Sequence, residues 1–285
     1  MFKLGRRTAA ALGSTAAVAV AVSAIGMTSG SAAAASGRAA ASAPPGLMTN
    51  GQLVVGMSLQ FKPEMYLKGN TPAGYDVDLL HKLAAYAHVK LVIKNLGFNG
   101  LIPGLQTKKF DMVSVGLSPT PARAKVVTFS NAYVPYALIV GIPKADANKI
   151  TKISQLNTPN DTITALLGST DNALAKSTFP KAKINALADQ NSDFSLVATG
   201  RANAIVVEDY LLAAYNKANP GKLVQAKIKP LNVQYGSWAV QHGNTALAKY
   251  LNKFLCTMSK NGTLAALYKK DMGVKSFPGV PACKA

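Results

Sequence analysis

Several residues that could bind an anion lie close together in the segment VGLSPTPARAKVVTFS, residues 115–130. Thr120 is a good N-cap and Pro121 suits the first helical position, so a short helix is expected directly after the apolar run FDMVSVGL. Free backbone N–H groups at a helix start favour an anion, and the Ser118 hydroxyl adds a further donor. Arg123 can present its planar guanidinium to a carboxylate. The alternative is that Arg123 pairs with a surface acid and that the prolines only shape a turn.

Two further polar groups follow predicted apolar strands. Gly168, Ser169 and Thr170 lie between such a strand and a predicted helix, and would form a second capped helix start. Glu208 and Asp209 come directly after the run AIVV, where an acid could hold an ammonium group or cap the next helix. An anion site, a second helix start and an acid would together suit a zwitterionic ligand.

Strand-like and helix-like runs alternate along the chain, and they would position these groups. Apolar residues recur at helical spacing in the helix expected at 74–89. Alternation of this kind predicts an α/β fold with a mostly parallel sheet and helices on its faces. It restarts near residue 136, which suggests two lobes. Strands are expected at 52–58, 90–96, 110–117, 136–144, 161–168, 202–210 and 236–243, and helices at 74–89, 100–109, 169–177, 245–259 and 263–270.

Residues 1–45 are expected to lie outside this fold. Lys3, Arg6 and Arg7 give a positive start, an Ala/Val-rich run follows to about residue 27, and small residues come next. This is the pattern of a secretory signal peptide followed by a flexible linker. We therefore expect the protein outside the cytoplasm, in a periplasm or at a cell surface. No cysteine precedes Cys256 that could carry a lipid, and the sequence leaves open whether the signal segment is cleaved or kept as an anchor.

The two cysteines, Cys256 and Cys283, are expected to form a disulfide because an exported chain meets an oxidising environment. On the loop-entropy account, that bond would stabilise the fold by roughly 3 kcal/mol. A redox-active pair is disfavoured, since the two cysteines are far apart and form no C-x-x-C motif.

The chain is strongly basic, with a formal net charge of +19. Nucleic acid is disfavoured as a partner because the lysines occur singly or in pairs and not in long runs. An anionic cell-envelope surface is the partner that this charge favours for an exported protein. A merely solvated surface is the alternative.

Five motifs occur in the order found in the bacterial extracellular solute-binding proteins of family 3, the polar amino-acid-binding proteins of ABC transporters. They are GYDVDLL, GFNGLIPGLQTKKFDMVSVGLSPTPARAKVVTFSNAYV, GSTDNAL, QYGSWAV and NGTLAALYKK. The chain resembles that family from about residue 52 to residue 273. The resemblance implies two α/β lobes joined by two crossing strands, near residues 136–144 and 229–238, with a ligand between the lobes. Lobe 1 would comprise residues 46–139 and 237–285, and lobe 2 residues 140–236.

The resemblance also implies roles for single residues. Arg123 matches the arginine that binds the ligand's α-carboxylate, with Ser118 beside it. Ser169 and Thr170 match the helix start that completes this contact from lobe 2. Glu208 matches the acid, usually Asp, that receives the α-ammonium group. The aromatic residues that enclose the ligand side chain would be Phe61 and Phe98, which could instead be ordinary core residues.

Two departures from the family pattern bear on the ligand. Gly116 stands where several members have a hydroxyl residue. Ser58 stands where an Asp often contacts an amide or cationic side chain. Without that acid, a neutral polar or acidic amino acid is favoured over a cationic one. The expected partners are this ligand and the membrane subunits of an ABC transporter, with the protein acting as a monomer.

An enzyme with the same fold is the alternative function. Some exported dehydratases that aromatise cyclohexadienyl acids resemble this family and use a catalytic acid in the cleft. Glu208 would be the general acid, if burial raised its pKa. We favour the binding protein, for which no cofactor is expected. A metal site is not expected either, because no acid or thiol lies close in sequence to complete the pair His81 and His88.

Overall fold

The computed structural model describes residues 43–284. The predicted signal peptide and most of the predicted linker, residues 1–42, lie outside this part of the chain. Within the described part, no helix is both long and apolar enough to cross a membrane.

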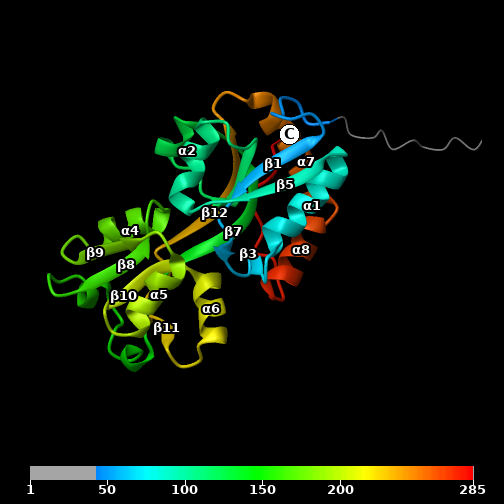
Figure 1. The fold of residues 1–285 in the computed structure, drawn as a ribbon. Coiled ribbons are helices and arrows are strands. Elements are labelled where there is room, and N and C mark those ends of the chain that lie inside the picture. Colours follow the sequence, from blue (N-terminus) through cyan, green and yellow to red (C-terminus); the bar gives the residue numbers. More distant parts are fainter. Residues whose placement is uncertain (1–42, 285) are drawn as a thin grey trace, which may run out of the picture. The chain divides into compact units, whose positions relative to one another are not determined.

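Nine strands form one mixed sheet (Figure 1). Its two ends are parallel, as the sequence predicts: β1 pairs with β5 and β6, and β8 pairs with β9 and β10. The order is β5-β1-β6-β12-β7-β10-β8-β9, and β11 pairs with β7 off this path. The bounds are β1 Gln52–Met57, β5 Lys90–Asn95, β6 Met112–Leu117, β7 Val127–Pro143, β8 Thr162–Leu166, β9 Lys183–Leu187, β10 Ala204–Glu208, β11 Leu223–Gln225 and β12 Asn232–Gln241.

The antiparallel strands β7 and β12 run side by side in the middle of the sheet. At one end of this pair, β12 also pairs with β6. At the other end, β7 also pairs with β10 and β11. The strand predicted at 136–144 therefore begins too late, because β7 starts at Val127. The first half of β7 contains polar residues and Pro135, which interrupt the apolar pattern that predicts a strand. Its pairing with β12 is also irregular, with register shifts at Gly236 and Ser237. Both predicted lobe boundaries fall within these two strands, and their position stays a prediction.

One group of helices packs on the sheet at the β1 and β5 end, and another group packs at the β8 and β10 end. Four of them pack near β1, β5, β6 and β7: α1 Tyr75–Ala87, α2 Leu101–Gln106, α7 Thr245–Lys260 and α8 Thr263–Met272. Two others, α4 Thr170–Thr178 and α5 Gln190–Ala198, pack on β8 and β10, and α6 Asp209–Ala218 packs on β7, β10 and β11. The prediction of a helix to residue 109 is too long, because the left-handed conformation of Lys108 ends the helical run.

Short elements complete the fold, and the sequence analysis missed several of them. A small antiparallel sheet lies between β1 and α1 and consists of β2 Gln60–Phe61, β3 Met65–Lys68 and β4 Thr71–Ala73. The short helices are α3 Pro121–Ala124 and the 3-10 turns η1 Phe98–Gly100, η2 Lys144–Asp146 and η3 Ile153–Leu156. The strands β9 and β11 and the helices α5 and α6 were not predicted either.

Apolar residues are buried on both faces of the sheet where its strands are short and parallel. In β10, Ile205 and Val207 belong to one apolar cluster, while Ala204 and Val206 belong to a second cluster on the other face of the sheet. Side chains of successive strand residues point to opposite faces, so a strand covered by helices on both sides reads as a continuous apolar run.

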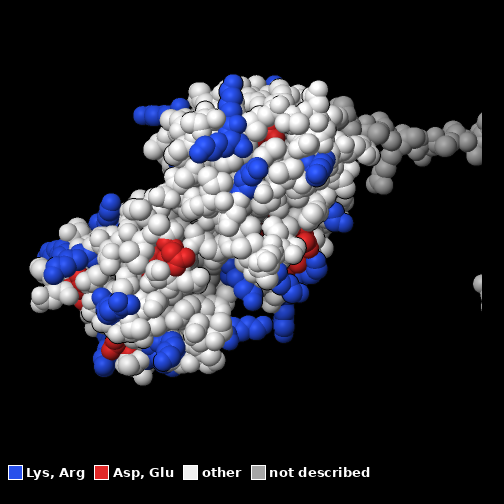
Figure 2. Space-filling model, viewed as in Figure 1, with Lys and Arg blue, Asp and Glu red and all other residues white. Residues whose placement is uncertain are grey.

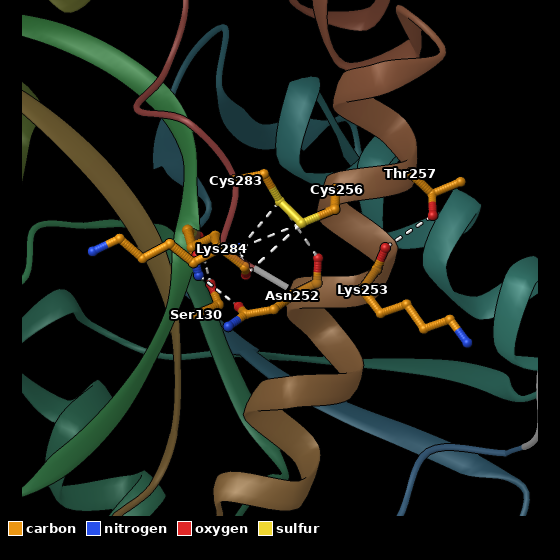
Figure 3. Close-up of a disulfide and its surroundings, with 8 residues drawn as sticks. Ser130, Asn252, Lys253, Cys256, Thr257, Cys283 and Lys284 are labelled. Atoms are coloured by element: carbon orange, nitrogen blue, oxygen red, sulfur yellow. Dashed lines mark hydrogen bonds between the residues drawn. A yellow bond between two sulfur atoms is a disulfide. The ribbon is translucent and has the colours of Figure 1, made fainter.

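The predicted disulfide between Cys256 and Cys283 is present (Figure 3). It joins helix α7 to the C-terminal segment, with 5.5 Å between the two Cα atoms. Asn131 of β7 donates from its side-chain amide to the Lys284 carbonyl at 2.7 Å. The last residues of the chain are therefore held against both α7 and β7.

On the face that Figure 2 shows, Lys and Arg side chains are scattered widely and Asp and Glu side chains occupy fewer, smaller patches. Every lysine between residues 43 and 284 is exposed, and so is Arg201. Of the twelve acids in the chain, only Asp189 and Asp209 belong to the exposed class. Among the described residues, ion pairs involve two lysines, Lys149 and Lys270. The acids are therefore mostly inside and the bases outside.

Candidate functional site

A small pocket lies where the ends of β6, β8 and β10 meet. Eight of the nine ligand-binding residues predicted from the sequence line it: Phe61, Phe98, Gly116, Ser118, Arg123, Ser169, Thr170 and Glu208. The cavity volume is about 20 Å³, roughly enough for one water molecule. Because an amino acid is much larger than a water molecule, the walls of this pocket must separate before one could enter.

The ninth predicted residue, Ser58, does not line this pocket. It is buried at the end of β1, and its hydroxyl accepts a hydrogen bond from the Gln60 side chain at 3.0 Å. It faces a separate surface depression with Asn95 and Asp189. The structure thus gives no support for a ligand contact at this position.

Arg123 lies in the short helix α3, whose start has the predicted capping. The Thr120 side chain accepts a hydrogen bond from the Arg123 backbone N–H, and Pro121 occupies the first turn. The guanidinium donates to the carbonyls of Ser118 at 3.0 Å and Gly168 at 3.1 Å. Burial lowers the pKa of Arg123 from its ordinary value. Arg123 therefore faces the start of α4 across the pocket, as an anion-binding residue would.

Gln234 of β12 joins the two predicted hydroxyl residues. Its side-chain carbonyl accepts from Ser118 Oγ and, at 2.9 Å, from Thr170 Oγ1. Ser118 Oγ is also hydrogen bonded to the Tyr136 hydroxyl. The side chain of Ser169 caps α4 by accepting from Asn172 N at 3.1 Å. The hydroxyls needed for a polar ligand are therefore held by strands β7 and β12.

Two aromatic rings form one wall. Phe61 and Phe98 meet edge to face with ring centroids 6.1 Å apart, and the Arg123 guanidinium carbon lies 5.6 Å from the Phe98 ring centroid. Both distances lie in the range of attractive aromatic and cation–π contacts. Phe98 is only half-buried, so it can contact a ligand.

The predicted acid Glu208 lines the pocket, and a second acid, Asp171, lies next to it. Glu208 ends β10, and burial raises its pKa to about 7. Asp171 lies in the first turn of α4 and is 1% exposed. Burial, followed by the neighbouring Glu208 carboxyl, raises the pKa of Asp171 well above its usual range. This pair would favour a ligand that brings a positive charge.

Glu64 is a further acid in the pocket, and the sequence analysis did not assign it. It is 1% exposed, and its Oε2 accepts a hydrogen bond from the Tyr210 hydroxyl. A Cβ atom added at Gly116 would lie 2.6 Å from Glu64 Oε1, and the φ angle of Gly116 is +56°. The missing side chain at position 116 therefore makes room for the Glu64 carboxyl.

Comparison with known proteins identifies the family. Residues 53–274 match the family described as bacterial extracellular solute-binding proteins, family 3. The chain belongs to this family. The arginine-binding extracellular protein ArtP of Bacillus subtilis (strain 168), a family 3 relative, is 30% identical over 224 residues, which are 77% of this chain and 85% of ArtP.

Solved structures agree with this family 3 assignment and with the two-lobed fold. The ancestral amino acid-binding protein AncCDT-1, described as a precursor of cyclohexadienyl dehydratase, is 33% identical with a TM-score of 0.73. The match covers 78% of this chain and 96% of that one. The substrate binding protein of an amino acid ABC transporter is 32% identical with a TM-score of 0.71, covering 78% and 99%. In this chain, the two parallel ends of the sheet, each covered by helices, correspond to the two lobes, and β7 and β12 run between them.

Three polar residues that line the pocket escaped the sequence analysis as binding candidates: Glu64, Tyr136 and Tyr210. Tyr210 directly follows the flagged pair Glu208 and Asp209, so its place in sequence was a usable signal. Glu64 and Tyr136, like the neighbouring Gln234, reach the site only through contacts with elements distant in the chain. No local pattern marks them.

Proposed function

We propose that this protein captures a free amino acid between its lobes and delivers it to the membrane subunits of an ABC transporter. The observation that carries this proposal is that Arg123 and Glu208 line the same pocket. An arginine and an acid in one pocket suit the carboxylate and ammonium groups of a zwitterion. The protein would act as a monomer without a cofactor and without catalysis.

Capture would proceed by lobe closure. Arg123 would bind the α-carboxylate first, and closure would then bring the start of α4 and Glu208 onto the ligand. Contacts such as Arg123 Nη2 to Gly168 O already link the two sides of the pocket. A ligand favours the closed state only through contacts that the open state lacks, and the second wall supplies these. The lobe boundaries proposed for this movement are those given by the sequence, within β7 and β12.

The test is a thermal-shift screen of the purified protein against the twenty amino acids. A ligand at a hundred times its dissociation constant stabilises a protein by about 2.7 kcal/mol, which is readily measured. We expect a narrow set of amino acids to raise the melting temperature. No shift with any amino acid would contradict the proposal.

Arg123→Ala is the matching variant. Truncating one partner of a buried charge pair costs roughly 2–5 kcal/mol, so we expect binding of the selected amino acid to weaken by that amount. Arg201→Ala is the control, because Arg201 is an exposed arginine outside the pocket. Equal affinity in both variants, measured by calorimetry, would remove Arg123 from the site.

The ligand side chain is a separate question. Relatives of this chain carry names that state binding of arginine, histidine, cystine or glutamine. The family pattern at position 58 favours a neutral polar or acidic side chain over a cationic one, but Ser58 does not line the pocket. The pocket acids Glu64 and Glu208 argue against an acidic side chain, since like charges would be buried together.

An enzymatic function is the second candidate. The pKa of Glu208, raised to about 7 by burial, suits a general acid at neutral pH. AncCDT-1, one of the similar structures, is described as a precursor of cyclohexadienyl dehydratase. Incubation with prephenate tests this candidate: a change in ultraviolet absorbance that Glu208→Gln abolishes would establish it, and no change would leave the binding function alone.

The exposed lysines support a second kind of contact. We propose that the protein is held near its transporter by an anionic cell-envelope surface, because its own surface has hardly any negative charge to weaken that attraction. The two exposed acids, Asp189 and Asp209, are too few to balance it.

A further inference from the structure

The Glu64 carboxyl lines the pocket and takes part in no ion pair among the described residues. Its Oε1 atom is buried and accepts no hydrogen bond from an amide, hydroxyl or basic group of those residues. Its other neighbour is an acid, Asp76, with which it can share a proton. A buried negative charge is costly unless a positive charge pairs with it, and a cationic group of a ligand in the pocket could supply that charge.

Among the described residues, no lysine or arginine forms an ion pair with Glu64. The groups around it are acids and phenols from α1, β7, β10, α6 and α8: Asp76, Glu208, Tyr75, Tyr133, Tyr136, Tyr210 and Tyr268. Asp76, buried at the start of α1, accepts from Ser114 and Tyr133 at 2.6 Å each. Arg123 is the basic residue among those that line this pocket. It is engaged with the wall formed by Ser118 and Gly168.

The acids form two neighbouring pairs. Glu64 lies next to Asp76, and Glu208 lies next to Asp171. Two buried carboxyl groups in contact share one proton, so each pair carries about one negative charge. Arg123 supplies one positive charge. A zwitterion would leave the site with one net negative charge, while an amino acid with one more positive charge would make it neutral.

We propose that Glu64 receives the charged side chain of the ligand, so that the site selects amino acids with cationic side chains. This inference rests on the proposed function, since it takes the α-carboxylate to Arg123 and the α-ammonium to Glu208. It reverses the preference that the serine at position 58 gave. Glu64, six residues further along the chain, supplies the acid that Ser58 does not.

The first experiment compares ligands by isothermal titration calorimetry of the purified protein. We expect L-arginine or L-lysine to bind at least roughly 10-fold more tightly than L-glutamine, the gain of an added charge-assisted contact. L-glutamate should bind more weakly than L-glutamine. Tighter binding of L-glutamine or L-glutamate would overturn this inference and leave the proposed function intact. Failure of every amino acid to bind would overturn the proposed function itself.

The second experiment uses Glu64→Gln, which keeps the shape and can still accept from the Tyr210 hydroxyl. We expect the affinity for L-arginine or L-lysine to fall roughly 100-fold, as when one partner of a buried charge pair is removed. The affinity for L-glutamine should change little. Asp78→Asn is the control, because it removes a negative charge outside the pocket, where Asp78 pairs with Lys270. Equal effects of Glu64→Gln on both ligand types would contradict the inference.

The third measurement needs no variant. Burial, then the neighbouring Asp76 and Glu208, raise the pKa of Glu64 well above its usual range. A bound cation favours the carboxylate and lowers this pKa, so the cationic ligand should release a proton and bind more tightly as pH rises. The α-ammonium group acts on Glu208 for every amino acid, so Glu64 accounts for the difference between L-arginine and L-glutamine. Calorimetry in two buffers of different ionisation enthalpy measures this release. Equal release for both ligands would overturn the inference.

Discussion

At the scale of single residues, the position of the Glu64 carboxyl depends on the absence of a side chain at Gly116. The chain turns through a left-handed conformation at Gly116, and Glu64 Oε1 occupies the space that a Cβ atom would take. On sequence alone, the glycine looks like the loss of a hydroxyl. In the folded protein, the glycine leaves room for the buried Glu64 carboxyl in the pocket. A residue without a side chain therefore allows a negative charge to lie in the site.

Gly116→Ala should therefore weaken ligand binding by displacing Glu64. The left-handed conformation alone costs a residue with a Cβ atom about 1–2 kcal/mol, so some stability is lost as well. Gly243→Ala isolates that cost, because Gly243 has a φ of +80° and nothing within 4 Å of the added atom. We expect calorimetry to show weaker binding in the first variant and wild-type binding in the second. Indistinguishable affinities would mean that Glu64 tolerates the methyl group.

Some site residues can be predicted from their neighbours in the sequence, and others cannot. Arg123 and Ser169 were predictable because neighbours in sequence, such as Thr120 and Pro121, fix the helix starts that present them. Glu64 was not predictable as a pocket acid, since its environment comes from Asp76 and Tyr210, which reach it only in the folded chain.

At the scale of elements, the same contrast explains which strands were found. The run AIVV of β10 is buried on both faces, and continuous apolar runs are recognised easily. In the first half of β7, apolar residues are mixed with polar ones and with Pro135, so its sequence resembles that of a loop. Its long antiparallel pairing with β12 makes it a strand, and that pairing joins residues about a hundred positions apart.

The C-terminal segment depends on one covalent link to α7. The disulfide closes a loop with a sequence separation of 27, and the loop-entropy account assigns such a bond about 3 kcal/mol. Cys283→Ser should lower the free energy of unfolding by about that amount, as measured by urea denaturation. Reducing agent should bring the wild type to the same value and leave the variant unchanged. A variant as stable as the oxidised wild type would show that hydrogen bonds such as Asn131 to Lys284 suffice.

At the scale of the whole molecule, positive and negative charges occupy different places. Of the acids that line the pocket, Glu64 is buried and Glu208 is half-buried, while lysines and arginines are scattered over the surface that Figure 2 shows. The two sets act at different ranges. The pocket acids are enclosed and weakly screened, so they act on a bound ligand, whereas exposed charges act together on large anionic surfaces and weaken with salt.

Binding to an anionic surface should therefore be strong at low salt and independent of the amino acid ligand. We expect the protein to sediment with vesicles that contain phosphatidylglycerol and not with vesicles of phosphatidylcholine alone. Raising the ionic strength from about 0.01 to about 1 M shortens the Debye length from about 30 to about 3 Å, and this should release the protein. Lys108→Glu with Lys109→Glu should weaken the binding moderately, because many other exposed lysines remain. Arg123→Ala removes a positive charge inside the pocket instead, and this variant should sediment like the wild type. Sedimentation that ignores salt, or that is equal with both kinds of vesicle, would mean that the surface charge serves solubility and not retention.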